Sequence, residues 1–510
     1  MPQRLRIVLP LAVLAALVPL YWLALIQPAV GMMHDDGIYA AAAKSLAEGH
    51  GFRIDSLPGT PAQTKYGTLY PLLLAAGWRL FPHFPQNALL LKLITVAFVP
   101  VWLWFCYQFL TRHLAIPGAA ALWICAFTAG LPWCVFSGSA LMSEMPFCAF
   151  SAGALWLAAE IEGKAEVTPK RAAACAILAS AAYLTRSIAL AVVLAGALAF
   201  LRPRRKIKGL AFYLAICGAC AAGWLLWQLG HRDGYVLPQL RYYTEDCFRD
   251  WSALASHDPP GRLVALAVLN LRNVLTYPTG MVAVFTRTPV LLAIAKFALW
   301  AAVLMGVRPV LKIWSFSGFV VLYFGAMLVW RWYPDRFLLP LYPYLFAFAY
   351  LGIPARLRPS VCGLCLVGLV VNGLWFADAT VRAEFPNAMA GRRSWGRQAA
   401  LDDWIRRNAE PGAVVAGDLD GAIYLFTGHR AVMPWVINPE PLYGIALPVS
   451  EQIRDFESVL RQCRVRYWID SDNNPVSNPR SEDLVRAATL DGTISLVAAP
   501  APGVRVFAVR

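Results

Sequence analysis

Residues 7–39 read IVLPLAVLAALVPLYWLALIQPAVGMMHDDGIY, an apolar run that ends shortly before two adjacent aspartates. A run of this length crosses the hydrocarbon core of a bilayer as a helix, because a helix satisfies its own backbone hydrogen bonds. It is too long for the core of a secretion signal, even though residues 29–31 offer the small side chains of a weak cleavage site. We therefore expect an uncleaved first membrane span, with Asp35 and Asp36 just beyond its far end.

Similar apolar runs recur as far as residue 378. Hydrophobic residues make up 59% of the 510 positions and only 15% are charged, whereas a soluble domain carries about a quarter charged residues. We expect an all-α, polytopic membrane domain over residues 1–378, followed over 379–510 by a small, soluble C-terminal α/β domain. The membrane domain should contain about eleven spans, at 7–30, 87–110, 115–135, 139–160, 171–184, 187–201, 208–229, 289–307, 312–330, 337–354 and 360–378.

The net charge of +15 is confined to the membrane domain. The chain has 45 Lys and Arg against 30 Asp and Glu, but residues 379–510 carry 15 of each, so the whole excess precedes them. Basic loops mark the cytoplasmic side of a membrane protein, and this placement argues against nucleic acid as a partner. With eleven spans the clusters share one side, which puts the N-terminus in the cytoplasm and the C-terminal domain outside a bacterial inner membrane. The clusters are Arg4/Arg6, Arg112, Lys164/Lys170/Arg171, Arg202/Arg204/Arg205/Lys206/Lys208, Arg308/Lys312 and Arg356/Arg358.

Three segments then face outward: a first loop 31–86, a second loop 230–288 and the C-terminal domain. Residues 69–81 are too short to span, and we expect them to form a helix that lies in the outer interface. In the C-terminal domain the alternation of apolar residues predicts three strands and two helices. The strands are Val414–Gly417, Tyr467–Ile469 and Val504–Val509, and the helices lie near 396–408 and 449–463.

Acidic residues occur at the outward ends of two predicted spans. Asp35 and Asp36 begin a helical pattern, where an aspartate caps free N–H groups; alternatively, one serves as a base facing a lipid-borne substrate. Neighbouring helical residues point about 100° apart, so we favour Asp35 as the base and Asp36 as the cap. Glu144 lies at a membrane depth where ionisable groups are usually functional. The alternative for Glu144 is a carboxylate in interfacial water.

Four cations lie beside spans on the outward side, where basic residues should be scarce. Arginine binds a phosphate through two parallel hydrogen bonds, and lysine binds it as a point charge. The alternative is anchoring to lipid head groups. With the acids, these cations describe a site for an anionic, membrane-held donor and a carboxylate that deprotonates an acceptor. They are Lys65, Arg186, Arg331 and Arg336.

Several short motifs follow one another in an order that resembles the GT-C glycosyltransferases, in the branch of the protein O-mannosyltransferases and lipid A aminoarabinose transferases. The resemblance covers nearly the whole chain, and the order and sidedness of the motifs carry more weight than any single one. In the membrane domain the motifs are Asp35-Asp36-Gly37 with Tyr39, Lys65 followed by Leu69-Tyr70-Pro71, Ser143-Glu144, Leu184-Thr185-Arg186, and Arg336-Phe337-Leu338-Leu339-Pro340 with Pro343. In the tail they are Trp404-Ile405-Arg406-Arg407-Asn408, Pro411-Gly412-Ala413-Val414-Val415 and Tyr424-Leu425-Phe426-Thr427-Gly428-His429-Arg430.

The resemblance implies transfer of a sugar from a polyprenyl-phosphate carrier to a lipid, glycan or protein acceptor at the outer face of the membrane. It gives one of the two first-loop aspartates the role of base or metal ligand, and Glu144 that of the second acid. A divalent metal, if the reaction uses one, would be held by these acids. The donor phosphate would be held by Lys65, Arg186 and Arg336, with Arg331 in the same outward turn.

Two departures from the family pattern affect these assignments. The family often has Asp-Glu where this chain has Asp35-Asp36, which leaves open which of the two is the base. It also usually has prolines directly after the lysine, whereas Tyr66-Gly67-Thr68 follow Lys65 here.

Three other functions compete with sugar transfer. A secondary transporter would show internal repeats and charges in mid-membrane, and the sequence shows neither. A non-catalytic scaffold would not need outward acids and cations that converge. A polymerase or ligase of surface glycans would use the same kind of lipid-linked donor, so it stays the nearest alternative.

Overall fold

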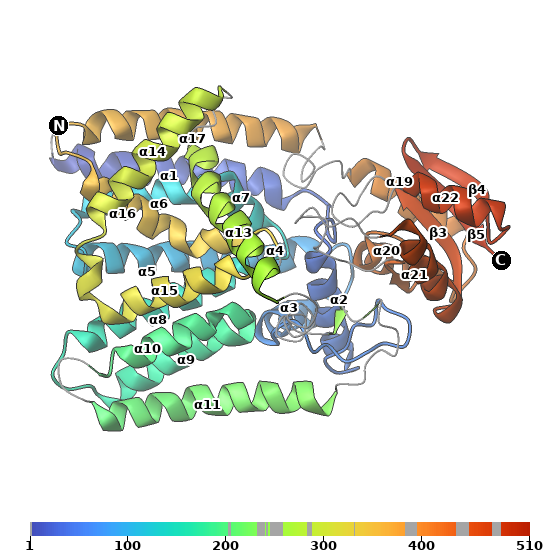
Figure 1. Ribbon diagram of the computed structural model, residues 1–510, viewed down its shortest axis with the longest axis horizontal. Helices are drawn as coiled ribbons and strands as arrows, with labels where there is room; N and C mark the ends of the chain where they lie inside the picture. The colour runs from blue at the N-terminus through green and yellow to red at the C-terminus, as the bar shows by residue number, and fades with distance from the viewer. Residues whose placement is uncertain are drawn as a thin grey trace.

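A helical bundle and a small α/β domain make up the chain, and Figure 1 shows the domain at one end of the bundle and the N-terminus at the other. The computed structural model describes residues 3–201, 206–231, 240, 243–244, 259–282, 288–330, 332–382, 395–434, 448–471 and 481–510. Arg331 and about half of the 230–288 segment lie outside these ranges.

The bundle contains long helices that lie side by side, with α1 and α17 along one edge and α11 along the opposite edge (Figure 1). Helices α2 (Asp35–Glu48) and α3 (Leu69–Leu80) form an outer layer between the bundle and the C-terminal domain. The bundle elements are α1 (Gln3–Leu25), α4 (Ala88–Val96), α5 (Phe98–Arg112), α6 (Gly118–Ala129), α7 (Pro132–Ser139), α8 (Glu144–Glu162), α9 (Pro169–Thr185), η1 (Ser187–Ala189), α10 (Leu190–Leu198), α11 (Ile207–Gly230), α13 (Pro259–Val282), α14 (Pro289–Gly306), η3 (Val310–Lys312), α15 (Trp314–Leu328), η4 (Arg336–Leu341), α16 (Tyr342–Gly352) and α17 (Arg358–Val381).

The expected number of about eleven spans is not confirmed by the described helices. Five of them are long and apolar enough to cross a bilayer, or six if α6 and α7, which meet at 67°, form one bent span. Several predicted spans are shorter or interrupted: the segment 337–354 is divided between η4 and α16, and 115–135 between α6 and α7. In addition, α13 is helical although it falls in the segment that the sequence analysis treats as the second outer loop.

The outer surface of the bundle is apolar, as expected of helices that face lipid. Leu226 of α11 is 68% exposed, Phe297 of α14 77% and Val321 of α15 70%. Between helices the contacts involve small residues: Cys175 of α9 approaches the Ala154 carbonyl of α8, and the alanines of α8 are buried, as are Ala172, Ala176, Ala179 and Ala182 of α9. Small side chains let membrane helices come close enough for van der Waals packing.

The helix ends gather in two separate groups. At the end near the N-terminus, Glu162 accepts the backbone N–H groups of Trp314 at 2.7 Å and Ser315 at 2.9 Å, and Lys206 donates to the Ile161 carbonyl at 2.6 Å. Lys206, one of the basic residues that the charge pattern assigns to the cytoplasmic side, therefore lies beside Glu162 and the start of α15. Asp35, Glu144, Arg186 and Arg336 gather at the other end.

The C-terminal domain is a five-stranded sheet in the order β2-β1-β3-β5-β4. β1 is parallel to β2 and β3, whereas β5 is antiparallel to β3 and β4. The three predicted strands and both predicted helices are present; the sequence analysis missed β2, β4, α20 and α22. The elements are α19 (Trp395–Asn408), β1 (Val414–Ala416), α20 (Asp420–Thr427), β2 (Ala431–Val432), α21 (Val449–Gln462), β3 (Val465–Ser471), α22 (Ser481–Leu490), β4 (Ile494–Ala501) and β5 (Val504–Val509).

The close packing of α14 on α16 gives a test of the bundle. A Cβ on Gly352 would lie 1.9 Å from the Ala302 carbonyl oxygen, whereas a Cβ on Gly363 of α17 would meet nothing within 4 Å. We expect Gly352→Ala to destabilise the purified protein by about 1–3 kcal/mol, the usual cost of overpacking. Thermal unfolding in detergent measures the loss, with Gly363→Ala as the matched control. Equal melting temperatures for the two variants would contradict this packing.

Candidate active site

Asp35 is the first residue of α2, at the end of the bundle that carries the C-terminal domain. Both of its oxygens are engaged: the Tyr66 hydroxyl donates to Oδ1 at 2.7 Å, and Arg336 Nη2 donates to Oδ2 at 3.0 Å. Charge-assisted hydrogen bonds of this kind are the strong ones in proteins. The predicted base is therefore held by a residue of the first outer loop and by one from the start of η4.

Arg336 also reaches the second predicted acid. Its Nη1 lies 3.4 Å from Oε1 of Glu144, and Nη1 of Arg186 lies 2.7 Å from the same oxygen. Glu144 begins α8 and is 2% exposed, while Arg186 follows the last residue of α9. Four elements thus bring two carboxylates and two guanidinium groups into one cluster, which we call the acid–arginine cluster (Asp35, Glu144, Arg186 and Arg336).

Polar and aromatic side chains support the acid–arginine cluster. Arg186 donates to Ser143 Oγ at 3.1 Å, and the Tyr39 hydroxyl shares a 2.8 Å hydrogen bond with the same oxygen. The Arg186 guanidinium lies over the Phe337 ring, 4.7 Å from its centroid. The sequence motifs contain Tyr39, Tyr66 and Ser143, but the sequence analysis gave them no role. Buried charges need hydrogen-bonding neighbours, which is the signal that could have pointed to them.

Lys65 and Asp36 lie beside the acid–arginine cluster, and each has partners of its own. Lys65 Nζ lies 5.5 Å from the Tyr66 ring centroid, and its charge is among those that stabilise ionised Asp35. Asp36 accepts the backbone N–H groups of Gly31 at 2.7 Å and Met33 at 2.9 Å. The expected helix cap is therefore not observed: the N-cap position of α2 is His34, without a side-chain cap, and Asp36 accepts from the turn that precedes the helix, while Asp35 faces Arg336. Arg331 lies outside the described residues.

The electrostatic environments of the two aspartates differ. Burial opposes ionisation of Asp35, but Arg336, the Tyr66 hydroxyl, His34 and Lys65 outweigh it and lower the pKa of Asp35 to about 2. Burial raises the pKa of Asp36, despite the backbone hydrogen bonds that favour its charge. For Arg336, burial opposes the charge, yet the Asp35 and Glu144 carboxylates raise its pKa. Within the acid–arginine cluster, Asp35 and Arg336 therefore each stabilise the charged form of the other.

The cluster does not fit a divalent metal held by the predicted acids. A metal shared by Asp35 and Glu144 would sit between them, where the Arg336 guanidinium lies, and the Asp36 oxygens face the backbone of residues 31 and 33. Within the described residues, a group with the spacing of metal ligands is Glu48, His50 and Asp55. Glu48 and His50 are exposed, and His50 is already paired with Asp55 at 2.7 Å.

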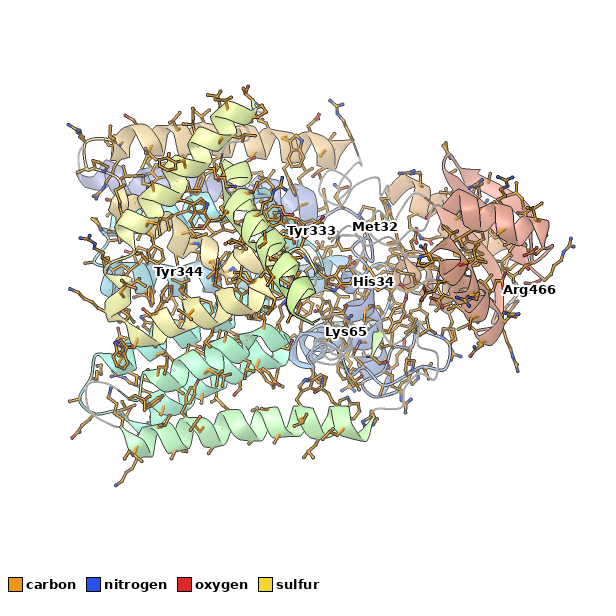
Figure 2. The ribbon with its side chains drawn as sticks, viewed as in Figure 1. Met32, His34, Lys65, Tyr333, Tyr344 and Arg466 are labelled. Carbon is orange, nitrogen blue, oxygen red and sulfur yellow. The ribbon has the colours of Figure 1, made fainter. Side chains whose placement is uncertain are left out.

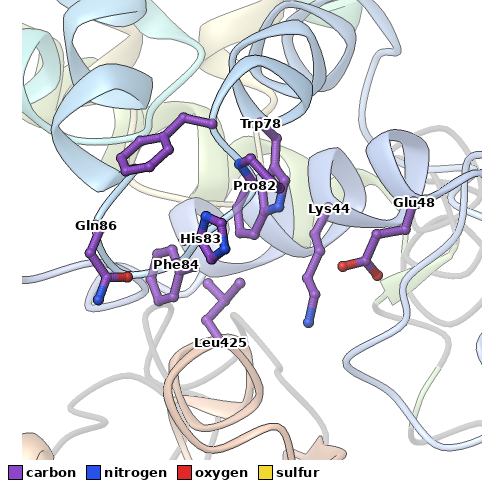
Figure 3. Close-up of a pocket in the computed structure, with 9 residues that line it drawn as sticks. Lys44, Glu48, Trp78, Pro82, His83, Phe84, Gln86 and Leu425 are labelled. Carbon is purple, nitrogen blue, oxygen red and sulfur yellow. The ribbon is translucent and has the colours of Figure 1, made fainter.

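A cavity of about 730 Å³ lies on another face of α2 (Figure 3). Lys44 and Glu48 line it together with Trp78 and Phe84, and Leu425 of α20 closes it from below in the figure. Lys44 follows Asp35 by nine residues, which at 3.6 residues per turn places the two on about opposite sides of the helix. The cavity therefore belongs to the seam between the outer layer and the C-terminal domain, away from the acid–arginine cluster.

Comparison with known proteins identifies the architecture. No family model matches the sequence, and no curated protein matches it. Among solved structures, ArnT from Cupriavidus metallidurans in the apo state superposes with a TM-score of 0.56 at 12% identity, over 98% of this chain and 97% of that one. The structure of the same protein bound to undecaprenyl phosphate superposes with a TM-score of 0.56 at 13% identity, again over 98% of this chain and 97% of that one. The chain has the GT-C fold.

A second GT-C structure supports the same conclusion. The oligosaccharyltransferase AglB from Archaeoglobus fulgidus, in complex with an inhibitory peptide and a dolichol-phosphate, superposes with a TM-score of 0.50 at 13% identity, over 90% of this chain and 69% of that one. The expected GT-C bundle with a C-terminal α/β domain is thus confirmed as a fold. At such low identity the likeness extends to the fold alone.

The shared guanidinium gives a test of the acid–arginine cluster. Arg336→Met should leave two carboxylates facing each other in a buried site and cost about 3–5 kcal/mol of stability, as for other broken buried pairs. Adding Asp35→Asn to this variant should recover part of the loss, because it removes the carboxylate that has lost its cation, whereas Glu144 keeps Arg186. Thermal unfolding at pH 7 measures both. Arg382→Met, which breaks an exposed pair with Asp378 in α17, should change stability by at most about 1 kcal/mol. A double variant less stable than Arg336→Met would contradict the bridging role.

Proposed function

We propose that the chain is a membrane glycosyltransferase that moves a sugar from a polyprenyl-phosphate carrier to an acceptor at the outer face of the bacterial inner membrane. One observation carries the proposal: at one end of an apolar GT-C bundle, two arginines and two carboxylates from four elements form a single buried cluster. The charge pattern supports a cytoplasmic N-terminus and an outward C-terminal domain. The bound undecaprenyl phosphate of ArnT and the dolichol-phosphate of AglB agree with a lipid-linked donor.

In the proposed reaction the acceptor attacks the anomeric carbon of the sugar. The bond from that carbon to the acceptor forms as the bond to the phosphate oxygen breaks, and the carrier phosphate leaves with the bonding electrons. Arg186 and Arg336, with Lys65 nearby, stabilise the charge that grows on the phosphate, because preorganised donors are worth more at a dry site than in water. Asp35 takes the acceptor proton.

The resting contacts imply an order of events. A carboxylate with a pKa of about 2 is a poor base. Burial raises the pKa of Asp35, and Arg336 is the largest of the causes that lower it. A donor phosphate would compete for the same guanidinium, and a weaker Arg336–Asp35 contact raises the pKa of Asp35. In this scheme Asp35 becomes a better proton acceptor once the donor is in place.

The phosphate-binding role of the arginines is testable with the carrier itself. We expect Arg336→Ala to weaken binding of undecaprenyl phosphate by roughly ten- to a hundredfold, since one charge-assisted contact is worth about 1.5–3 kcal/mol. Titration of the lipid into protein in nanodiscs measures the affinity. Arg382→Ala serves as the control for a lost surface arginine. Parental affinity in the folded Arg336→Ala variant would count against the assignment.

The base role is testable without knowing the sugar. A strain that lacks the chain is complemented with the parental protein, Asp35→Asn or the exposed control Asp378→Asn, and mass spectrometry compares the envelope glycans. A placed base contributes about 10²–10⁴ in rate, so Asp35→Asn should lose the sugar modification that the other two restore. If Asp35→Asn keeps more than about a tenth of parental transfer, below the smallest effect of a general base, Asp35 is not the base.

A further inference from the structure

The turn that carries Asp35 contacts the C-terminal domain through a buried ionisable pair. Nε2 of His34 lies 3.2 Å from Oδ1 of Asp420, the first residue of α20, and Asp420 is completely buried. Neither of its carboxylate oxygens accepts a hydrogen bond from the described residues, so His34 is within ion-pair distance only. A buried carboxylate is costly unless a partner compensates it, so His34 is central to keeping Asp420 at this position.

α20 also packs closely against the same turn at two pairs of residues. A Cβ on Gly421 would lie 2.8 Å from the Cα of Gly37, and a Cβ on Gly31 would lie 2.7 Å from the Cβ of Ala422. Only glycine permits such approaches, because any side chain would overlap the facing backbone or methyl group. α20 therefore touches the chain on both sides of Asp35.

The backbone of the turn leaves little freedom between these contacts. His34 has a φ of +66°, a left-handed conformation that non-glycine residues seldom adopt. Asp36 closes the turn by accepting the Gly31 and Met33 N–H groups. Figure 2 places His34 and Met32 at the junction of the bundle and the C-terminal domain. A strained backbone conformation persists only where surrounding contacts hold it in place. Here several of these contacts come from α20 of the C-terminal domain.

The same turn determines where Asp35 points. Asp35 follows His34 directly, and its carboxylate must meet Arg336 and Tyr66, which belong to other elements. We propose that Asp420 is a positioning residue for sugar transfer: through His34, and with the Gly37–Gly421 approach, it holds the Asp35 carboxylate in register with Arg336. The C-terminal domain is then part of the catalytic apparatus. The predicted effect of Asp420 on the rate of sugar transfer rests on the proposed function. Its predicted effect on the conformation of residues 31–39 does not.

The test uses the full-length protein and two measurements. The variants are His34→Gln, Asp420→Asn, the double variant and Gly421→Ala; the controls are Asp403→Asn, an exposed carboxylate of the same domain, and Gly363→Ala, which has open space. Hydrogen–deuterium exchange follows the amides of residues 31–39. Glycan transfer in the complemented strain and undecaprenyl phosphate affinity in nanodiscs are measured in parallel.

We expect faster exchange at residues 31–39 in all four variants and parental exchange in both controls. Transfer should fall by about ten- to a hundredfold, because a misplacement of about 1 Å can cost a hundredfold. Affinity for undecaprenyl phosphate should stay within about threefold, the pattern of a group that acts after binding. The double variant should transfer sugar no more slowly than the slower of the two single variants, since both substitutions remove the same interaction.

Two outcomes would overturn the inference. Parental exchange at residues 31–39 in Asp420→Asn and His34→Gln would mean that the pair does not hold the turn. Faster exchange with parental transfer would mean that the turn does not position the base. If the parental protein itself transfers no sugar, the proposed function fails, and the exchange data alone decide whether Asp420 holds the turn.

Discussion

The contact of Arg336 with both Asp35 and Glu144 is the constraint on which the end of the bundle next to the C-terminal domain depends. The side chains of Glu144, Asp35 and Arg336 are 2%, 14% and 24% exposed, and a charge that is largely buried is costly without a partner. The starts of α2, α8 and η4 must therefore meet at one point, and Arg186 brings in the end of α9. The proposed site for an anionic donor needs such preorganised cations, and the two acids lie within ion-pair distance of them.

The bundle provides the rigid support for this cluster. Between its two ends the helices contact one another through small residues, as at Gly306 and Gly352, where the backbones of α14 and α16 nearly touch. At the opposite end, Glu162 and Lys206 pair with backbone groups at the starts and ends of helices. Described polar networks thus concentrate at the two ends, while apolar side chains such as Leu226 and Phe297 cover the outer surface between them.

The outer layer connects the bundle to the C-terminal domain. One end of α2 carries Asp35 toward the arginines and also meets α20, and Lys44, farther along, lies 4.6 Å from the Tyr424 ring centroid. The loop before α3 supplies Tyr66 to the site and Ser56, whose carbonyl accepts the N–H of Ala431 in β2. The outer layer therefore contacts both the bundle and the C-terminal domain. A change in how the α/β domain packs against this layer would also displace residues of the proposed active site.

The sequence by itself determined the apolar runs that become helices, the α/β nature of the tail and the set of charged residues at the outward end. These features follow from local composition and period, which one stretch of chain encodes alone. It did not determine the break between α6 and α7, the helix α13 or the number of spans, because proline bends and helix packing depend on neighbours. Nor did it show that Arg336 pairs with Asp35, a residue 301 positions away, or that His34 meets Asp420. The tertiary structure determines these partners. A buried charge is costly unless it is paired, and the packing of the helices decides which side chains lie close enough to pair with it.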